Sequence, residues 1–114
     1  MTDLTAAELV ERVRAGAARG LNLAAEHVLG IAIPRTPVEY GDLRSSLTVV
    51  PADADDLEAA IVTDLPYAVR QHEDLSLRHD DGGPKYLEGP TLEQADTVQR
   101  IVATAATRAL RGEA

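Results

Sequence analysis

The chain must build its core almost without aromatic side chains, which limits the folds open to it. Its 114 residues include three tyrosines but no phenylalanine and no tryptophan. Leucine, valine, isoleucine and many alanines therefore have to fill the interior, and alanine removes little apolar area from water. A chain of this length has room for one hydrophobic core, so we expect a single domain spanning residues 1–114. Because this core is thin, contacts with neighbouring copies would add to its stability.

The charge balance argues against a surface that grips nucleic acid. Nineteen acidic residues against eleven basic ones give a net charge of −8, whereas phosphate-binding surfaces cluster Lys and Arg. A channel that lets DNA slide past remains compatible, because acidic walls would not hold it. The sequence has no cysteine, no start typical of a signal peptide and no apolar run near the ~20 residues of a membrane span. We expect a soluble protein that is cytoplasmic at synthesis and does not bind membranes.

The N-terminal third has the pattern of a long amphipathic helix. Thr5 and Glu8 have the spacing of a capping box, and Leu4 and Leu9 occupy the two positions of a hydrophobic staple. Further apolar residues recur three or four positions apart, which places them on one helical face. They are Leu9, Val13, Ala17, Leu21, Ala24 and Val28. We therefore predict that this face is buried.

Glycines and prolines interrupt the same helical pattern. Gly16, Gly20 and Gly30 each lower helix stability by up to about 1 kcal/mol relative to alanine. We expect them either to admit another backbone at close range or to mark a bend. Pro34 and Pro37 are expected to end the helix, because proline lacks an N–H and its ring clashes with the preceding turn.

A β-hairpin is predicted after a turn-rich connection. Residues 47–50 (LTVV) and 57–63 (LEAAIVT) are rich in side chains that favour strands. Between them lies an acidic loop, residues 52–56, in which three of the five residues are aspartates. We predict an antiparallel hairpin whose acidic tip is solvated.

The C-terminal half is expected to complete the sheet and to end in a helix. Local patterns predict a helix over 67–73, a strand over 75–79, a glycine-rich turn over 81–84 and a returning strand over 85–87. The last helix is predicted to begin near Pro90, where Thr91 and Gln94 have capping-box spacing. Its buried stripe would consist of Leu92, Ala95, Val98, Val102, Ala105 and Ala109.

These elements predict an α+β fold. It would contain a long N-terminal helix and a small, mostly antiparallel sheet of about four strands with a short inserted helix. The C-terminal helix would pack on the sheet, since an amphipathic helix and a half-buried sheet each need an apolar partner.

No catalytic or ligand-binding motif stands out. His72 and His79 each precede two acidic residues, but HExxH spacing fails because residue 76 is serine. Ser45 and Ser46 lie outside any G-x-S-x-G context, and the glycines form no nucleotide-binding loop. We therefore predict a protein that is not an enzyme and holds no metal or cofactor. A metal-assisted hydrolase that uses His72, His79 and nearby carboxylates stays open as a minor alternative.

Two arginines after the first helix are candidate interface residues. Arg35 and Arg44 lie among prolines, a tyrosine and serines in residues 34–46, a segment too short to form a core. Exposed arginine and tyrosine are enriched at protein interfaces. Salt bridges to Glu39 or Asp42 explain these arginines equally well.

Several short sequence motifs occur in an order that resembles the order found in a known family. Residues 41–46 (GDLRSS) are similar to the pattern T-G-x-L-R-x-S. Residues 67–90 (YAVRQHEDLSLRHDDGGPKYLEGP) resemble the pattern Y-A-x-x-Q-H-E … H … G-G-x-K-Y-L-E-x-P. Both patterns are those of tailed-bacteriophage neck proteins, the head–tail connectors of the tail-completion or minor capsid type. In element order the resemblance covers roughly residues 1–110.

The resemblance implies a structural virion protein without catalytic activity. Copies of the chain, six in number, would form a ring at the neck between the head-closing and tail-terminator proteins. DNA would pass through the lumen without sequence-specific binding. The protein would lie in the host cytoplasm during assembly and at the head–tail junction of the virion. Together with the two arginines above, the resemblance nominates these subunit-interface residues: Arg35, Arg44, Tyr67, His72, Glu73, Tyr86, Leu87 and Glu88.

A small acidic adaptor or regulator that binds a host protein is the main alternative. It would be a monomer or dimer, and its net charge and lack of catalytic motifs would look the same. Mass in solution separates the two hypotheses, because a ring-forming protein is expected to assemble, at least on its partner.

Overall fold

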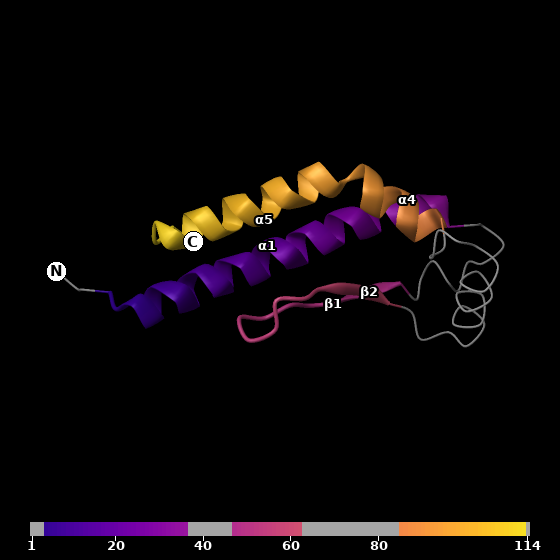
Figure 1. Cartoon of the computed structure of the whole chain (residues 1–114). Coiled ribbons are helices and arrows are strands. Elements are labelled where there is room, and N and C mark those ends of the chain that lie inside the picture. Colours follow the sequence, from indigo (N-terminus) through magenta and orange to yellow (C-terminus); the bar gives the residue numbers. More distant parts are fainter. Residues whose placement is uncertain (1–3, 37–46, 63–84, 114) are drawn as a thin grey trace.

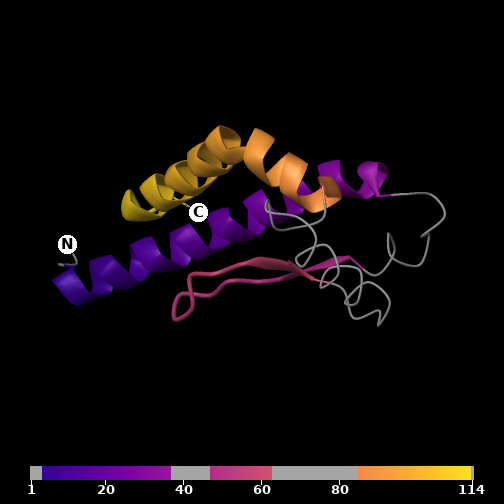
Figure 2. The ribbon, with the colours of Figure 1, turned by 45° about the vertical axis from the view of Figure 1, so that its right-hand side comes forward.

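One long helix organises the structure. The computed structural model describes residues 4–36, 47–62 and 85–113, with side chains from residue 88 onward in the last segment. Its elements are α1 (Ala6–Arg35), β1 (Thr48–Val50), β2 (Ala60–Val62), α4 (Lys85–Glu93) and α5 (Ala95–Leu110). Helix α1 lies in the middle, with α5 along one side and the β1–β2 hairpin along the other (Figure 1). Figure 2 shows this arrangement turned, with α4 beside the C-terminal part of α1. The molecule is elongated, 59 × 27 × 22 Å along its principal axes.

Helix α1 begins as predicted. The hydroxyl oxygen of Thr5 accepts the Glu8 N–H at 3.1 Å, so Thr5 is the N-cap. The same hydroxyl donates to a carboxylate oxygen of Glu8, also at 3.1 Å. The first of these bonds satisfies one of the amides that a helix start leaves without a partner.

The end of α1 lies between the two prolines that were expected to stop it. Pro34 is in the last turn, and Arg35 is the final helical residue. The N–H of Thr36 then donates to the carbonyls of Ala32 and Ile33, each at 3.1 Å, and its hydroxyl donates to Ala32 at 3.0 Å. Since the last carbonyls of a helix otherwise lack partners, the buried Thr36 stabilises this end.

Helices α1 and α5 approach each other closely at two glycines of α1. A Cβ on Gly16 would overlap the Cβ of Ala109 and lie 2.9 Å from the carbonyl oxygen of Ala105. A Cβ on Gly20 would lie 2.7 Å from the Cα of Val102. Neither site has room for a side chain, so both glycines admit a neighbouring backbone, which is one of the two roles predicted for them.

Helix α1 is buried on more than the predicted face. Of the predicted stripe, Ala24 and Val28 are buried, while Leu9, Val13, Ala17 and Leu21 are half-buried. Of the other buried residues, Gly16, Gly20 and Ala32 lie within or at the edge of that face, whereas Ala18 and Leu29 lie on another side of the helix. The reason is the central position of α1 between α5 and the hairpin, which a single apolar stripe does not reveal.

The predicted β-hairpin is confirmed, with shorter strands. Strand β1 pairs with β2 in antiparallel fashion, and Val49 lies opposite Ile61 at the centre of the register. Each strand has three residues, because 57–59 belong to the connection and not to β2. These are the two strands of the described segments. The helix predicted over 67–73 and the strand predicted over 75–79 lie outside the described residues.

The acidic loop is held against α1, which corrects the expectation of a freely solvated tip. The N–H of Ala52 donates to Asn22 Oδ1 at 2.7 Å, and Asn22 Nδ2 donates to the Ala52 carbonyl at 3.0 Å. Arg14 Nε donates to the carbonyl of Ala54 at 2.7 Å. Ala52 is buried, so polar side chains of α1 replace water as partners of the loop backbone.

The carboxylates of the acidic loop are exposed, as predicted. Asp53 Oδ1 accepts the N–H groups of Asp55 and Asp56, each at 2.8 Å, which forms an Asx-type turn. Within the described residues, the side chains of Asp55 and Asp56 have no hydrogen-bond or ion-pair partner. The loop therefore presents ordered negative charge at Asp55 and Asp56 that is unpaired within the described part of the chain.

The segment after residue 84 differs from the prediction. Residues 85–87 form the first turn of α4 and not a strand, and the helix continues through Gly89 and Pro90. Tertiary packing overrides these local signals, because α4 packs on α1 and Pro90 is fully buried. The predicted capping box is also wrong. Thr91, the predicted N-cap, lies inside α4 and does not precede a helix; Gln94 follows α4, and its Oε1 lies 2.8 Å from His27 Nε2.

Helix α5 packs mainly on α1 and not on the sheet, which corrects the predicted architecture. In its predicted stripe, Ala109 is buried and Val98, Val102 and Ala105 are half-buried. Ala95 and Leu92 are exposed, Leu92 to 68%. The physical reason is the glycine pair of α1, which lets α5 reach that helix directly.

Candidate assembly surface

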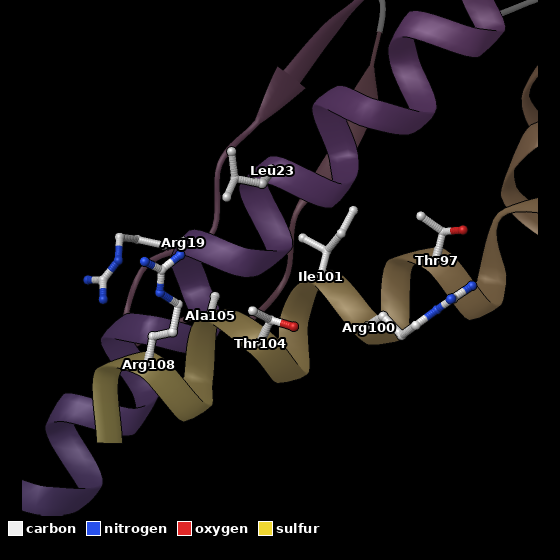
Figure 3. Close-up of a pocket in the computed structure, with 8 residues that line it drawn as sticks. All are labelled: Arg19, Leu23, Thr97, Arg100, Ile101, Thr104, Ala105 and Arg108. Atoms are coloured by element: carbon white, nitrogen blue, oxygen red, sulfur yellow. The ribbon is translucent and has the colours of Figure 1, made fainter. Parts of the chain in front are cut away.

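A groove of about 630 Å³ runs between α1 and α5. Helix α1 supplies two of its lining residues and α5 supplies six, spread over about three turns. Figure 3 shows them: Arg19, Leu23, Thr97, Arg100, Ile101, Thr104, Ala105 and Arg108. We call this feature the arginine groove. The groove lies beside the contact of Gly16 and Gly20 with α5, which holds the two helix backbones close together.

The arginine groove combines an apolar interior with a basic rim. Leu23 is 61% exposed, an unusual degree for a large apolar side chain, and Ile101 lies across from it on α5. Figure 3 shows Arg19 and Arg108 together at one end of the groove and Arg100 at the other. Three of the eleven cationic residues thus line one hollow of a chain that carries a net charge of −8.

The three guanidinium groups are largely available for an external partner. Arg19 has no side-chain hydrogen bond or ion pair within the described residues. Arg108 lies 3.9 Å from a carboxylate oxygen of Glu113, with both side chains at least half exposed, so this pair is weak. Arg100 Nε donates to a backbone carbonyl of its own helix at 3.4 Å. A planar guanidinium binds carboxylate oxygens in bidentate fashion, so the rim suits an acidic partner.

The arginine groove was not predicted from the sequence, although the residues of α5 that line it recur there at helical spacing. Arg100, Thr104 and Arg108 are spaced by four residues, and so are Thr97, Ile101 and Ala105. Such rows form ridges along one side of a helix. These rows indicate a groove only once α5 is known to pack on α1 beside Arg19 and Leu23.

A second hollow lies on the hairpin side of α1. Its volume is about 320 Å³, and it is lined by residues of α1, the hairpin connection, β2, α4 and α5: Leu21, Ala24, Ala25, Val28, Ala59, Ile61, Thr91 and Val98. None of these residues is charged. Strand β2 ends and α4 begins next to the undescribed residues 63–84, so we assign no function to this hollow.

Those predicted interface residues that the structure describes lie at one end of the molecule. Arg35 is the last residue of α1, and Glu88 is half-buried in the first turn of α4. Tyr86 and Leu87 belong to the same turn of α4, but their side chains lie outside the described part, as do four whole residues: Arg44, Tyr67, His72 and Glu73. An acidic residue at a helix start also favours the helix dipole, so the position of Glu88 has a structural explanation as well.

Arg35 forms a salt bridge, though with a different partner from the two considered. Its Nη1 and Nη2 donate to the two carboxylate oxygens of Glu93 in α4, at 3.1 and 2.8 Å. The hydrogen bond from Arg35 lowers the pKa of Glu93, and the bond to Glu93 raises the pKa of Arg35. Both side chains remain about half exposed, so the pair clips α4 to α1 without being buried.

The described residues contain no group of three or more side chains arranged to hold a metal ion. His72 and His79 lie outside those residues, and the described His27 contacts Gln94. None of the described helices combines the length and apolar character that crossing a membrane requires.

One comparison with known proteins gives a match. The model of the HK97-gp10-like family, described as "Bacteriophage HK97-gp10, putative tail-component", matches residues 4–71. The match includes α1 and the β1–β2 hairpin. Comparisons with curated proteins and with solved structures gave no match.

Proposed function

This chain belongs to the HK97-gp10-like family of bacteriophage tail components, and we propose that it completes the tail at the head–tail junction. Its tail role makes it a structural component of the virion. The finer proposal is a ring of identical copies around the DNA channel, between the head-closing and tail-terminator proteins. The family match over α1 and the hairpin is the observation that carries this proposal.

The surface of the described segments supports a role in assembly. Large apolar side chains are exposed on both the helices and the hairpin, among them Val10 of α1 at 57% and Val62 of β2 at 40%. Buried residues of the described core are mostly alanine and single valines or leucines, which bury little area each. A subunit of this kind gains stability when neighbours cover its apolar residues.

The proposal includes the absence of catalysis. The arginine groove and the hollow on the hairpin side of α1 are lined by arginine, threonine and aliphatic side chains, with no nucleophile beside a general base among these residues. An acidic chain also suits a DNA channel, because negative walls do not retain the passing duplex. The predicted interface residues at the α1–α4 end, Arg35 and Glu88, remain part of the proposal.

Disruption of the gene in the phage that encodes the chain tests the tail role. An early stop codon is expected to yield DNA-filled heads and tails that remain separate in negative-stain micrographs. Supplying the wild-type chain in trans should restore joined, infectious particles, and a second stop-codon copy should not. Joined and infectious particles without the chain would refute the proposal, as would its absence from purified virions by mass spectrometry.

A further inference from the structure

We infer that the arginine groove receives the acidic loop of a neighbouring copy of the same chain. Each subunit would offer its loop to one neighbour and its groove to the other. The inference deepens the proposed ring and rests on it.

The chemistry of the groove fits an acidic protein segment better than a DNA backbone. Phosphates would satisfy the arginines but would leave Leu23 and Ile101 facing water or charge. The acidic loop carries both kinds of group that the groove needs: unpaired carboxylates, and the exposed apolar side chains of Val50 and Leu57 on either side of it. The basic rim of the groove would contact the acidic tip of the neighbour's loop, and the apolar interior of the groove would contact the apolar residues on either side of that loop.

The loop is also ordered before it binds. The bonds from Asn22 and Arg14 fix its backbone on α1, and Asp53 closes its turn. A segment that is already ordered loses little conformational entropy on association. These bonds leave the carboxylates of Asp55 and Asp56 free to meet guanidinium groups.

Loop and groove lie at the same level of α1 but on different sides of it. The hairpin lies along one side of α1 and α5 along the other (Figure 1), and the loop bonds to Arg14 and Asn22 of α1 while the groove is lined by Arg19. The loop is thus directed away from the groove of its own subunit. A contact between two different surfaces of identical copies is head-to-tail, and it closes into a ring when the rotation between copies allows.

Charge reversal with a mixing step tests the contact. One variant carries Arg19→Glu with Arg108→Glu, and the other carries Asp55→Lys with Asp56→Lys. Each alone should self-associate at least about tenfold more weakly than wild type in sedimentation velocity, because like charges then meet. An equimolar mixture should restore assembly, since the acidic groove of one variant accepts the basic loop of the other. Circular dichroism confirms that both are folded.

Matched controls separate this contact from other effects of charge. Arg12→Glu with Arg111→Glu makes the same charge change outside the groove and should associate as wild type does. Raising salt should weaken wild-type assembly, because exposed charges are screened beyond about 8 Å at physiological ionic strength. A groove variant that assembles normally but loses binding to a duplex DNA probe would overturn the inference in favour of DNA. A loop variant that assembles normally while the groove variant does not would overturn it in favour of another acidic partner.

Disulfide trapping gives a second measurement that does not depend on affinity. The chain has no cysteine, so any disulfide reports the introduced pair. Asp55→Cys with Thr104→Cys should give a ladder of covalent oligomers on non-reducing gels after oxidation, whereas Asp55→Cys with Glu11→Cys should not. If the chain is present in virions but shows neither ladder nor rescue by mixing, this inference fails while the tail role stands.

Discussion

Replacing Gly16 with alanine should destabilise the protein, although alanine is the better helix former. In the absence of other contacts, the substitution would stabilise α1 by about 1 kcal/mol. Here the new methyl group would overlap the Cβ of Ala109 and lie 2.9 Å from the carbonyl oxygen of Ala105. Neither atom can rotate away, so α5 must move, and overpacking of this kind costs about 1–3 kcal/mol. Set against the gain in helix propensity, this cost leaves an expected net loss of up to about 2 kcal/mol in the free energy of unfolding.

Gly30→Ala is the matched control, because it makes the same chemical change in the same helix. Gly30 is exposed, and a Cβ there would meet nothing within 4 Å. This variant should gain about 0.5–1 kcal/mol from helix propensity alone. Urea unfolding followed by circular dichroism gives both values, and a fixed low protein concentration keeps self-association from contributing. If Gly16→Ala is stabilised as much as Gly30→Ala, α5 does not pack on α1 at this distance.

Two further predictions concern the contacts that hold the hairpin and α4 on α1. Asn22→Ala leaves the buried backbone of Ala52 without partners and should lower the free energy of unfolding in urea by about 1–3 kcal/mol. Asp55→Asn is the surface control. Equal stability of the two variants would contradict the docking of the loop on α1. Because Arg35 lowers the pKa of Glu93, their mutual stabilisation should be present above the ordinary glutamate pKa and lost as the pH falls through the lowered one. A double-mutant cycle with Arg35→Ala and Glu93→Gln checks this, and a coupling that does not change between neutral and acidic pH would refute it.

Local signals in the sequence were sufficient for the elements whose ends and partners are close in the chain. Thr5 and Glu8 predicted the start of α1, and the apolar runs around the acidic loop predicted the hairpin and its antiparallel pairing. Capping and hairpin formation involve residues a few positions apart, so periodicity and turn chemistry reveal them. The order of the sequence motifs in residues 41–46 and 67–90 also indicated a phage neck or tail protein, in agreement with the family to which the chain belongs.

Signals failed where a distant partner outweighed them. Gly89 and Pro90 indicated a helix start, but α4 runs through both because it packs on α1. Gln94 had capping spacing but contacts His27, and Leu92 had the period of a core residue but is exposed. Local propensities differ by about 1 kcal/mol, so contacts made by a whole helix can override them.

The sequence by itself determined the long first helix, the acidic hairpin and the composition of the core. It also contained Gly16 and Gly20, four residues apart, which could either admit another backbone at close range or mark a bend. Only the tertiary structure decided that α5 lies on α1 and not on the sheet, because that choice depends on Gly16 and Gly20 meeting Ala105 and Ala109 from the other end of the chain. The same contact brings Arg19 beside the arginines of α5 and creates the arginine groove. Spacing along one helix reveals its faces, but the face that another helix will cover depends on how closely the two backbones can approach.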